Sequence, residues 1–168
     1  MLIAVDSNVL IDQADGSADV LDALAVIRER LVRVGFIVPP TVLQELAFIA
    51  DEGDTAEEKQ LAVTVLSSLQ EWGYEPLNVV PVGQGIVEQI SLTLRMRSIV
   101  ADEEEKDATI IAESALLGCD ILLSSDVHLL DAQEHPAFRR VLEDANVEGD
   151  KIIIARPRDL VKKFFRRR

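Results

Sequence analysis

The chain has 168 residues and a formal net charge of −13 at pH 7, with 48% hydrophobic and 28% charged residues. This composition is typical of one globular domain over residues 1–168, and it excludes a disordered chain and a fibrous repeat. The apolar runs are too short to span a bilayer and no secretory signal precedes them, so we expect a cytoplasmic protein without membrane contact.

Short runs of Val, Ile and Leu predict the buried strands of a mainly parallel sheet. In chain order these runs are 2–5, 36–38, 77–82, 121–123 and 152–155. Longer segments with apolar residues at helical spacing lie between them, and this alternation places helices on both faces of the sheet. The expected architecture is therefore α/β, a three-layer α/β/α sandwich around the sheet.

Local signals give the expected bounds of the helices. Pro39 and Pro40 end a strand, and Thr41 with Gln44 fits a reciprocal capping box that starts the next helix. Proline and glycine mark the limits of several others. These helices are expected at 57–72, 85–99, 107–118, 138–145 and from 157 onward.

Two other features bear on the class of protein. Cys119 is the only cysteine, which excludes an intrachain disulfide and predicts a small buried core residue. The C-terminal run 162–168 is strongly basic. One interpretation is a nucleic-acid-binding patch, because salt screens the negative charge of the rest of the protein. The other is that its cations complement the dipole of a terminal helix.

Carboxylates follow the first and fourth predicted strands, at Asp6 and Asp126. Ligands of open parallel sheets bind beyond the carboxyl ends of the strands, so these two acids are expected to share one edge. Asp107, at the start of the helix before the fourth strand, can reach the same edge. So can Glu45, which lies among apolar residues in the first turn of the helix after Pro40.

Each acid taken alone also has a structural interpretation, since Asp6 and Asp126 can cap helices and Asp107 can complement a helix dipole. Glu45 can be an ordinary surface residue. Two carboxylates ~4 Å apart repel by about 4 kcal/mol at an effective dielectric near 20, so four in one cleft predict a bound cation. Oxygen ligands without a converging His or Cys favour Mg²⁺ or Mn²⁺ over zinc.

The sequence resembles the PIN domain family of metal-dependent ribonucleases over nearly its whole length. The motifs that carry the resemblance are Asp6-Ser7-Asn8, Glu45, Lys106-Asp107-Ala108 and Ser124-Ser125-Asp126. The resemblance implies a PIN-like fold and an enzyme that hydrolyses RNA phosphodiester bonds with Mg²⁺ or Mn²⁺. It assigns catalytic and metal-binding roles to Asp6, Glu45, Asp107 and Asp126, and supporting roles to Asn8 and Ser124.

Three neighbours of these acids have roles that the sequence leaves open. Glu103, one helical turn before Asp107, is either a supporting ligand or a solvated residue. Lys106 stands where the family often has a small or polar residue, and its charge either offsets the acids or faces solvent. His128 has the chemistry of a general base, but a lone His in a loop more often packs or donates a hydrogen bond.

The first functional hypothesis is a divalent-metal-dependent endoribonuclease, a phosphodiesterase that acts on RNA. By analogy with small family members it is also a toxin with an antitoxin protein as partner, and it is expected to form a homodimer. The alternative is a non-catalytic PIN-like module that binds RNA or a protein. A haloacid-dehalogenase-like phosphatase would need a second aspartate at Asn8, and no glycine-rich loop favours nucleotide hydrolysis.

Overall fold

The computed structural model describes residues 1–31 and 33–165, except for the side chains of 163–165. Its centre is a five-stranded sheet in the order β3-β2-β1-β4-β5, and each strand is parallel to its neighbours. The strands are β1 (Leu2–Val5), β2 (Gly35–Val38), β3 (Tyr74–Pro76), β4 (Ile121–Leu123) and β5 (Ile153–Ala155). The predicted parallel sheet is confirmed, with β1 in the middle.

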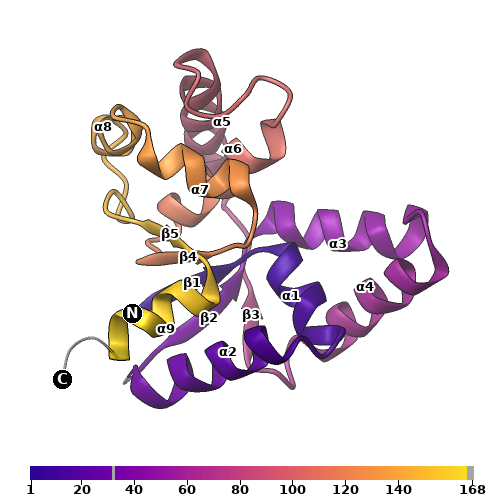
Figure 1. Ribbon diagram of the computed structural model, residues 1–168. Coiled ribbons are helices and arrows are strands. Elements are labelled where there is room, and N and C mark those ends of the chain that lie inside the picture. The colour runs from indigo at the N-terminus through magenta and orange to yellow at the C-terminus, as the bar shows by residue number, and fades with distance from the viewer. Residues whose placement is uncertain (32, 166–168) are drawn as a thin grey trace.

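Helices cover both faces of this sheet. Over the described residues they are α1 (Ser7–Ala14), α2 (Ala18–Arg30), α3 (Pro40–Glu52), α4 (Ala56–Ser68), α5 (Pro81–Met96), α6 (Glu105–Leu116), α7 (Val127–Glu134), α8 (Phe138–Asp144) and α9 (Pro157–Phe165). Figure 1 shows α5 to α8 on one side of the sheet and α2 with α9 on the other, while α3 and α4 project outward. The predicted three-layer α/β/α sandwich is confirmed. None of the helices, as far as they are described, is long and apolar enough to cross a membrane.

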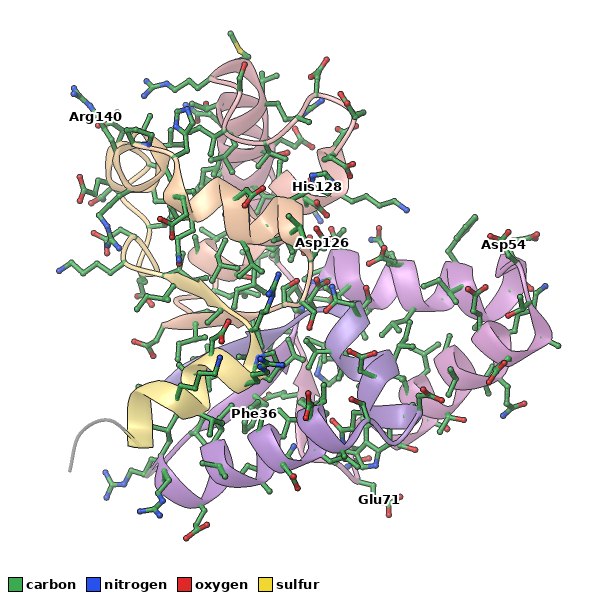
Figure 2. The ribbon with its side chains drawn as sticks, viewed as in Figure 1. Phe36, Asp54, Glu71, Asp126, His128 and Arg140 are labelled. Carbon is green, nitrogen blue, oxygen red and sulfur yellow. The ribbon has the colours of Figure 1, made fainter. Side chains whose placement is uncertain are left out.

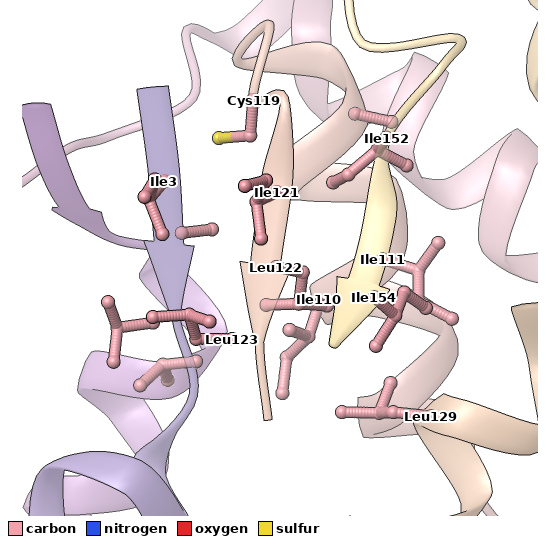
Figure 3. Packing of buried hydrophobic residues seen from close by; sticks show 14 of the residues in the cluster. Ile3, Ile110, Ile111, Cys119, Ile121, Leu122, Leu123, Leu129, Ile152 and Ile154 are labelled. Carbon is pink, nitrogen blue, oxygen red and sulfur yellow. The ribbon is translucent and has the colours of Figure 1, made fainter. Parts of the chain in front are cut away.

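The inner strands are apolar at every position because both of their faces are covered. Ile3 of β1 and Leu122 of β4 are fully buried. Figure 3 shows Leu122 with Ile110 of α6 beside it and Ile154 of the neighbouring strand. Each such side chain contributes about 1.5–3 kcal/mol through burial. Cys119, at 1% exposure, belongs to the same core, as predicted. Because the core packs against both faces of the sheet, the sheet supports the residues at its edge.

One predicted strand is wrong. The run 77–82 was expected to be a strand, but β3 ends at Pro76 and α5 begins at Pro81. Pro81 occupies the first turn of α5, where its fixed φ suits a helix and its missing N–H costs nothing. β3 instead pairs with β2, and Leu77 N–H still donates to Val38 O at 3.2 Å.

The expected capping box at Thr41 is also wrong. The helix begins one residue earlier, at Pro40, and the Thr41 hydroxyl donates to Glu113 Oε1 at 2.9 Å instead of capping. A capping box is present at the start of α4, between Thr55 and Glu58. As a result Glu45 lies in the second turn of α3, not in the first.

The remaining helix bounds differ by a few residues. α4 ends at Ser68 instead of residue 72, and α5 spans Pro81–Met96 instead of 85–99. α6 ends at Leu116, two residues before Gly118, whose φ of +74° reverses the chain after the helix. The basic run 162–168 lies largely outside the described residues, although Lys162 Nζ donates to Asp159 at 3.0 Å.

The order of strands places a topological switch between β1 and β4. The chain runs outward from β1 through β2 to β3, then crosses back to β4 on the other side of β1. Connections on either side of such a point leave a crevice at the carboxyl ends of the two strands. The residues that directly follow Val5 and Leu123 therefore meet at this edge.

Candidate active site

Asp6 extends β1 by one residue, and its carboxylate lies between the ends of β1 and β4. Its N–H donates to Leu123 O at 3.0 Å, which continues the ladder with β4. The carboxylate, 3% exposed, accepts hydrogen bonds from Ser7 N–H at 2.8 Å, Asn8 Nδ2 at 2.8 Å and Ser124 Oγ at 2.6 Å. Burial raises the pKa of Asp6 to about 6, against the lowering effect of the bonds from Ser124 and Ser7.

Asn8 and Ser124 connect the ends of the two strands. The Ser124 hydroxyl, fully buried, accepts from Asn8 Nδ2 at 3.2 Å and from Asp126 N–H at 2.9 Å. Asn8 Oδ1 accepts from Ser125 N–H at 3.0 Å. The Asn8 amide and the Ser124 hydroxyl therefore each donate and accept hydrogen bonds. This network fixes the loop after β4 relative to Asp6.

Asp126 begins α7 and lies half-buried after the end of β4. Its Oδ1 accepts from His128 N–H at 2.7 Å, so the capping role considered for this residue is real. Asp6 likewise caps α1. Figure 2 shows Asp126 and His128 at the start of α7. The His128 ring is 61% exposed, with Nε2 3.9 Å from Glu104 Oε1.

Asp107 lies in the first turn of α6, where its carboxyl group is partly buried. Burial raises its pKa to about 7, assisted by the negative charges of Asp126, Asp6 and Glu104. Its Oδ2 atom is buried and has no hydrogen-bond partner within the described part of the chain. An unsatisfied buried carboxylate oxygen is costly, so it marks a place for a cation or a proton.

Glu45 reaches Ser7, the neighbour of Asp6, from the second turn of α3. Its Oε2 accepts from Ser7 Oγ at 2.7 Å, and its charge contributes to the raised pKa of Asp6. The side chain is half-buried. Ser7, which the sequence interpretation left without a role, thus connects α1 to α3 across the site.

The structure brings four of the predicted acids together and leaves one outside. Asp6, Glu45, Asp107 and Asp126 come from four different elements. Besides burial, the charges of Glu45 and Asp126 raise the pKa of Asp6, and those of Asp126 and Asp6 raise the pKa of Asp107. Glu103 is exposed and precedes α6. Glu104, which the sequence analysis did not single out, is the neighbouring acid whose charge reaches Asp107. It is one residue closer to the helix, a difference that no sequence pattern revealed.

Lys106 and Glu113 lie near the site without joining it. Lys106 Nζ is positioned over the exposed ring of Phe48, 5.6 Å from its centroid, so its aliphatic and cationic parts cover α3. Glu113, at 6% exposure, accepts from both the N–H and the hydroxyl of Thr41 at 2.9 Å. Burial raises the pKa of Glu113, but its partner residues are those of α3.

The donor set suits a hard dication. Carboxylate oxygens are the ligands that Mg²⁺ and Mn²⁺ prefer, and Mg²⁺ usually binds through one or two carboxylates while it keeps several waters. Within the described residues no group of three His, Cys, Asp or Glu side chains already encloses a metal position. The unpartnered Oδ2 of Asp107 beside the charges of Asp6 and Asp126 nevertheless fits a dication that retains water ligands.

Replacing Ser7 by alanine tests how far Glu45 depends on its hydrogen bond. We expect the affinity for Mn²⁺ to fall about tenfold, because outer partners of metal-site carboxylates typically contribute 10- to 100-fold, while Ser7→Thr keeps a hydroxyl and most of the affinity. The matched control is Ser67→Ala on α4, whose hydroxyl donates to Val63 O of its own helix. Wild-type Mn²⁺ affinity of Ser7→Ala would show that Glu45 needs no such support.

The fold and the acids together define a class, α/β sandwich proteins with carboxylates gathered at the switch point of a parallel sheet. The family model described as PIN domain matches residues 3–148. The chain belongs to the PIN domain family, whose members are generally nucleases that typically use divalent metals. The predicted family membership is confirmed.

A solved structure shares the fold. The similar chain belongs to a crystal structure of VapBC2 from Rickettsia felis bound to a DNA fragment from the VapBC2 promoter. Its TM-score is 0.61 and its sequence identity is 11%. The similarity covers 93% of this chain and 98% of that one. The comparison with curated proteins gave no match.

Proposed function

We propose that the protein is a divalent-metal-dependent endoribonuclease that hydrolyses RNA phosphodiester bonds at the four-acid site. One observation carries the proposal: the Asp6 carboxylate and the Oδ2 atom of Asp107 are buried near the charge of Asp126, and this Oδ2 has no hydrogen-bond partner among the described residues. A stable fold has no reason to concentrate such groups, whereas a metal-dependent nuclease needs them.

The residues of the site have two proposed roles: some would hold the metal ion, and others orient the carboxylates that hold it. Asp6, Glu45, Asp107 and Asp126 would hold Mg²⁺ or Mn²⁺, and a bound ion of this kind supplies Lewis-acid activation of water and neutralises charge on the phosphate. Asp6 is fixed by three donors, and Ser7 fixes Glu45. Because these carboxylates are already oriented, little side-chain entropy is lost when the substrate binds.

The biological role that we propose is that of a cytoplasmic toxin paired with an antitoxin protein. The fold similarity to a chain of VapBC2 and the PIN family membership both support this role. Homodimerisation stays a prediction. The alternative of a non-catalytic binding module has the same fold, so only chemistry separates the two.

An assay of the wild-type protein with end-labelled single-stranded RNA tests the enzyme. With Mg²⁺ or Mn²⁺ we expect internal cleavage to fragments that lack 2′,3′-cyclic phosphate ends, because the attacking group is water and not the RNA 2′-hydroxyl. Fragment ends are identified by mass spectrometry. RNA that binds but stays intact with every metal would favour the binding module, and cyclic ends would contradict the proposed chemistry.

A further inference from the structure

Substrate binding by this protein poses an electrostatic problem. The chain carries a net charge of −13 and gathers four acids at the site, yet RNA is a polyanion. Screening over about 8 Å at physiological salt means that nearby cations, not the net charge, decide local binding. Cationic side chains at the same edge of the sheet are therefore the natural contacts for phosphates next to the cleaved one.

Arg156 lies at this edge. It directly follows β5, the neighbour of β4, and Ser124 N–H donates to Ala155 O at 3.2 Å where the two strands end. A cavity of about 190 Å³ lies beside it, and its lining includes Arg156, Arg158 and Ser125. Ser125 is next to Asp126 in the chain and donates its N–H to Asn8 Oδ1, so the cavity adjoins the acid site.

Two helices add positive potential to the cavity. Pro157, at the start of α9, and Ser17, at the N-cap of α2, are both lining residues. α9 packs against α2 (Figure 1), which brings the two N-termini to one place. Helix N-termini attract phosphate through the helix dipole and through free N–H groups, which at α9 leave out Pro157 because proline has no N–H. The Ser17 hydroxyl makes no side-chain cap bond to α2, so it remains available to a ligand.

Two aspartates also line the cavity and compete for the arginines. Asp19 pairs with Arg158 at 3.8 Å, but both side chains are well exposed, and exposed pairs of this kind contribute little stability. Asp12 is half-buried, and burial raises its pKa with help from Asp15. A phosphate offers more acceptor oxygens and more charge than Asp19, and can therefore replace it beside Arg158.

We propose that this cavity is a subsite for an RNA backbone phosphate adjacent to the phosphate held at the acids, with Arg156 and Arg158 as its cationic contacts. The inference rests on the proposed function for the identity of the ligand. It explains how a strongly acidic protein holds RNA, since cations lie within the same edge as the metal-binding carboxylates.

The test measures RNA affinity as a function of salt, with Ca²⁺ in place of Mg²⁺ and with the RNA verified as intact after each titration. For single strands the slope of log K against log salt changes by about 0.7 for each phosphate contact. We expect Arg156→Ala and Arg158→Ala each to lose about 0.7 of this slope, and Arg156→Lys to retain it.

Arg140→Ala is the matched control, because Arg140 also forms an exposed 3.8 Å ion pair, with Asp144. Figure 2 shows Arg140 on α8, far from Asp126, so the slope should not change. Unchanged slopes for both Arg156→Ala and Arg158→Ala would overturn the subsite. The same result is expected if the cavity binds an acidic partner protein instead of RNA. RNA cleavage with unchanged slopes would remove only the subsite. A lost slope without any cleavage would remove only the nuclease function.

Discussion

Asp6→Asn is expected to lower the rate of RNA cleavage by at least about 1,000-fold, a loss of about 4 kcal/mol of transition-state stabilisation. The substitution removes the charge of the most buried of the four acids while keeping its shape. Asp6 Oδ2 accepts from both Asn8 and Ser124, so an amide nitrogen in that position would face two donors. Single-turnover cleavage of labelled RNA with saturating Mn²⁺ measures the effect.

The matched control for Asp6→Asn is Glu113→Gln. Glu113 is also buried, with a raised pKa, but it is held by Thr41 outside the acid cluster. Its amide variant should cleave RNA within about threefold of wild type, since Glu113 is held by Thr41 and not by any of the four acids. Circular dichroism checks that both variants are folded. Substantial activity in folded Asp6→Asn would contradict a metal site at these residues.

Asp107→Asn is expected to stabilise the metal-free protein at high pH and to abolish its stabilisation by Mn²⁺. The pKa of Asp107 is raised from 3.8 to about 7, so the folded state binds more protons than the unfolded state between these values. Wild-type stability therefore falls as pH rises from about 4 to about 7 and then levels. A shift of this size corresponds to about 4 kcal/mol, which solvent screening and coupling reduce to about 2 kcal/mol.

Urea unfolding in chelator at pH 4.5 and pH 8 measures this difference. The variant should be more stable than wild type at pH 8 and similar to it at pH 4.5, because the protonated carboxyl carries no penalty. Mn²⁺ titration by thermal unfolding gives the second half of the result, since a ligand that binds only the folded state raises its stability. An equal rise in melting temperature for wild type and Asp107→Asn would place the metal elsewhere.

The strands that carry the site were predictable because they are the most buried. β1 and β4 are apolar at every position, and this pattern predicts a buried strand without knowledge of the rest of the fold. β3 was not predictable, since Tyr74-Glu75-Pro76 is an edge strand with two exposed residues and depends on its ladder with β2. The valines that follow it resemble a strand more closely, but Pro81 starts a helix there.

The positions of the acids were predictable from strand ends and helix starts, but their partners were not. Asp6 and Asp126 follow inner strands, a fact that the sequence alone displays. The bond from Ser7 to Glu45 depends on how α1 and α3 pack, and packing between helices leaves no local signal. Identifying Glu104 instead of Glu103 as the acid near Asp107 required the start of α6 to within one residue, which is finer than boundary signals allow.

The pairing of β1 with β4 has a consequence for translation. Ser124 and Asp6, joined by a hydrogen bond, are 118 residues apart, so a nascent chain that has not yet exposed β4 outside the ribosome has no complete acid cluster. By building the acid cluster from both halves of the polypeptide, this topology keeps the cluster incomplete in the growing chain until most of the message has been read.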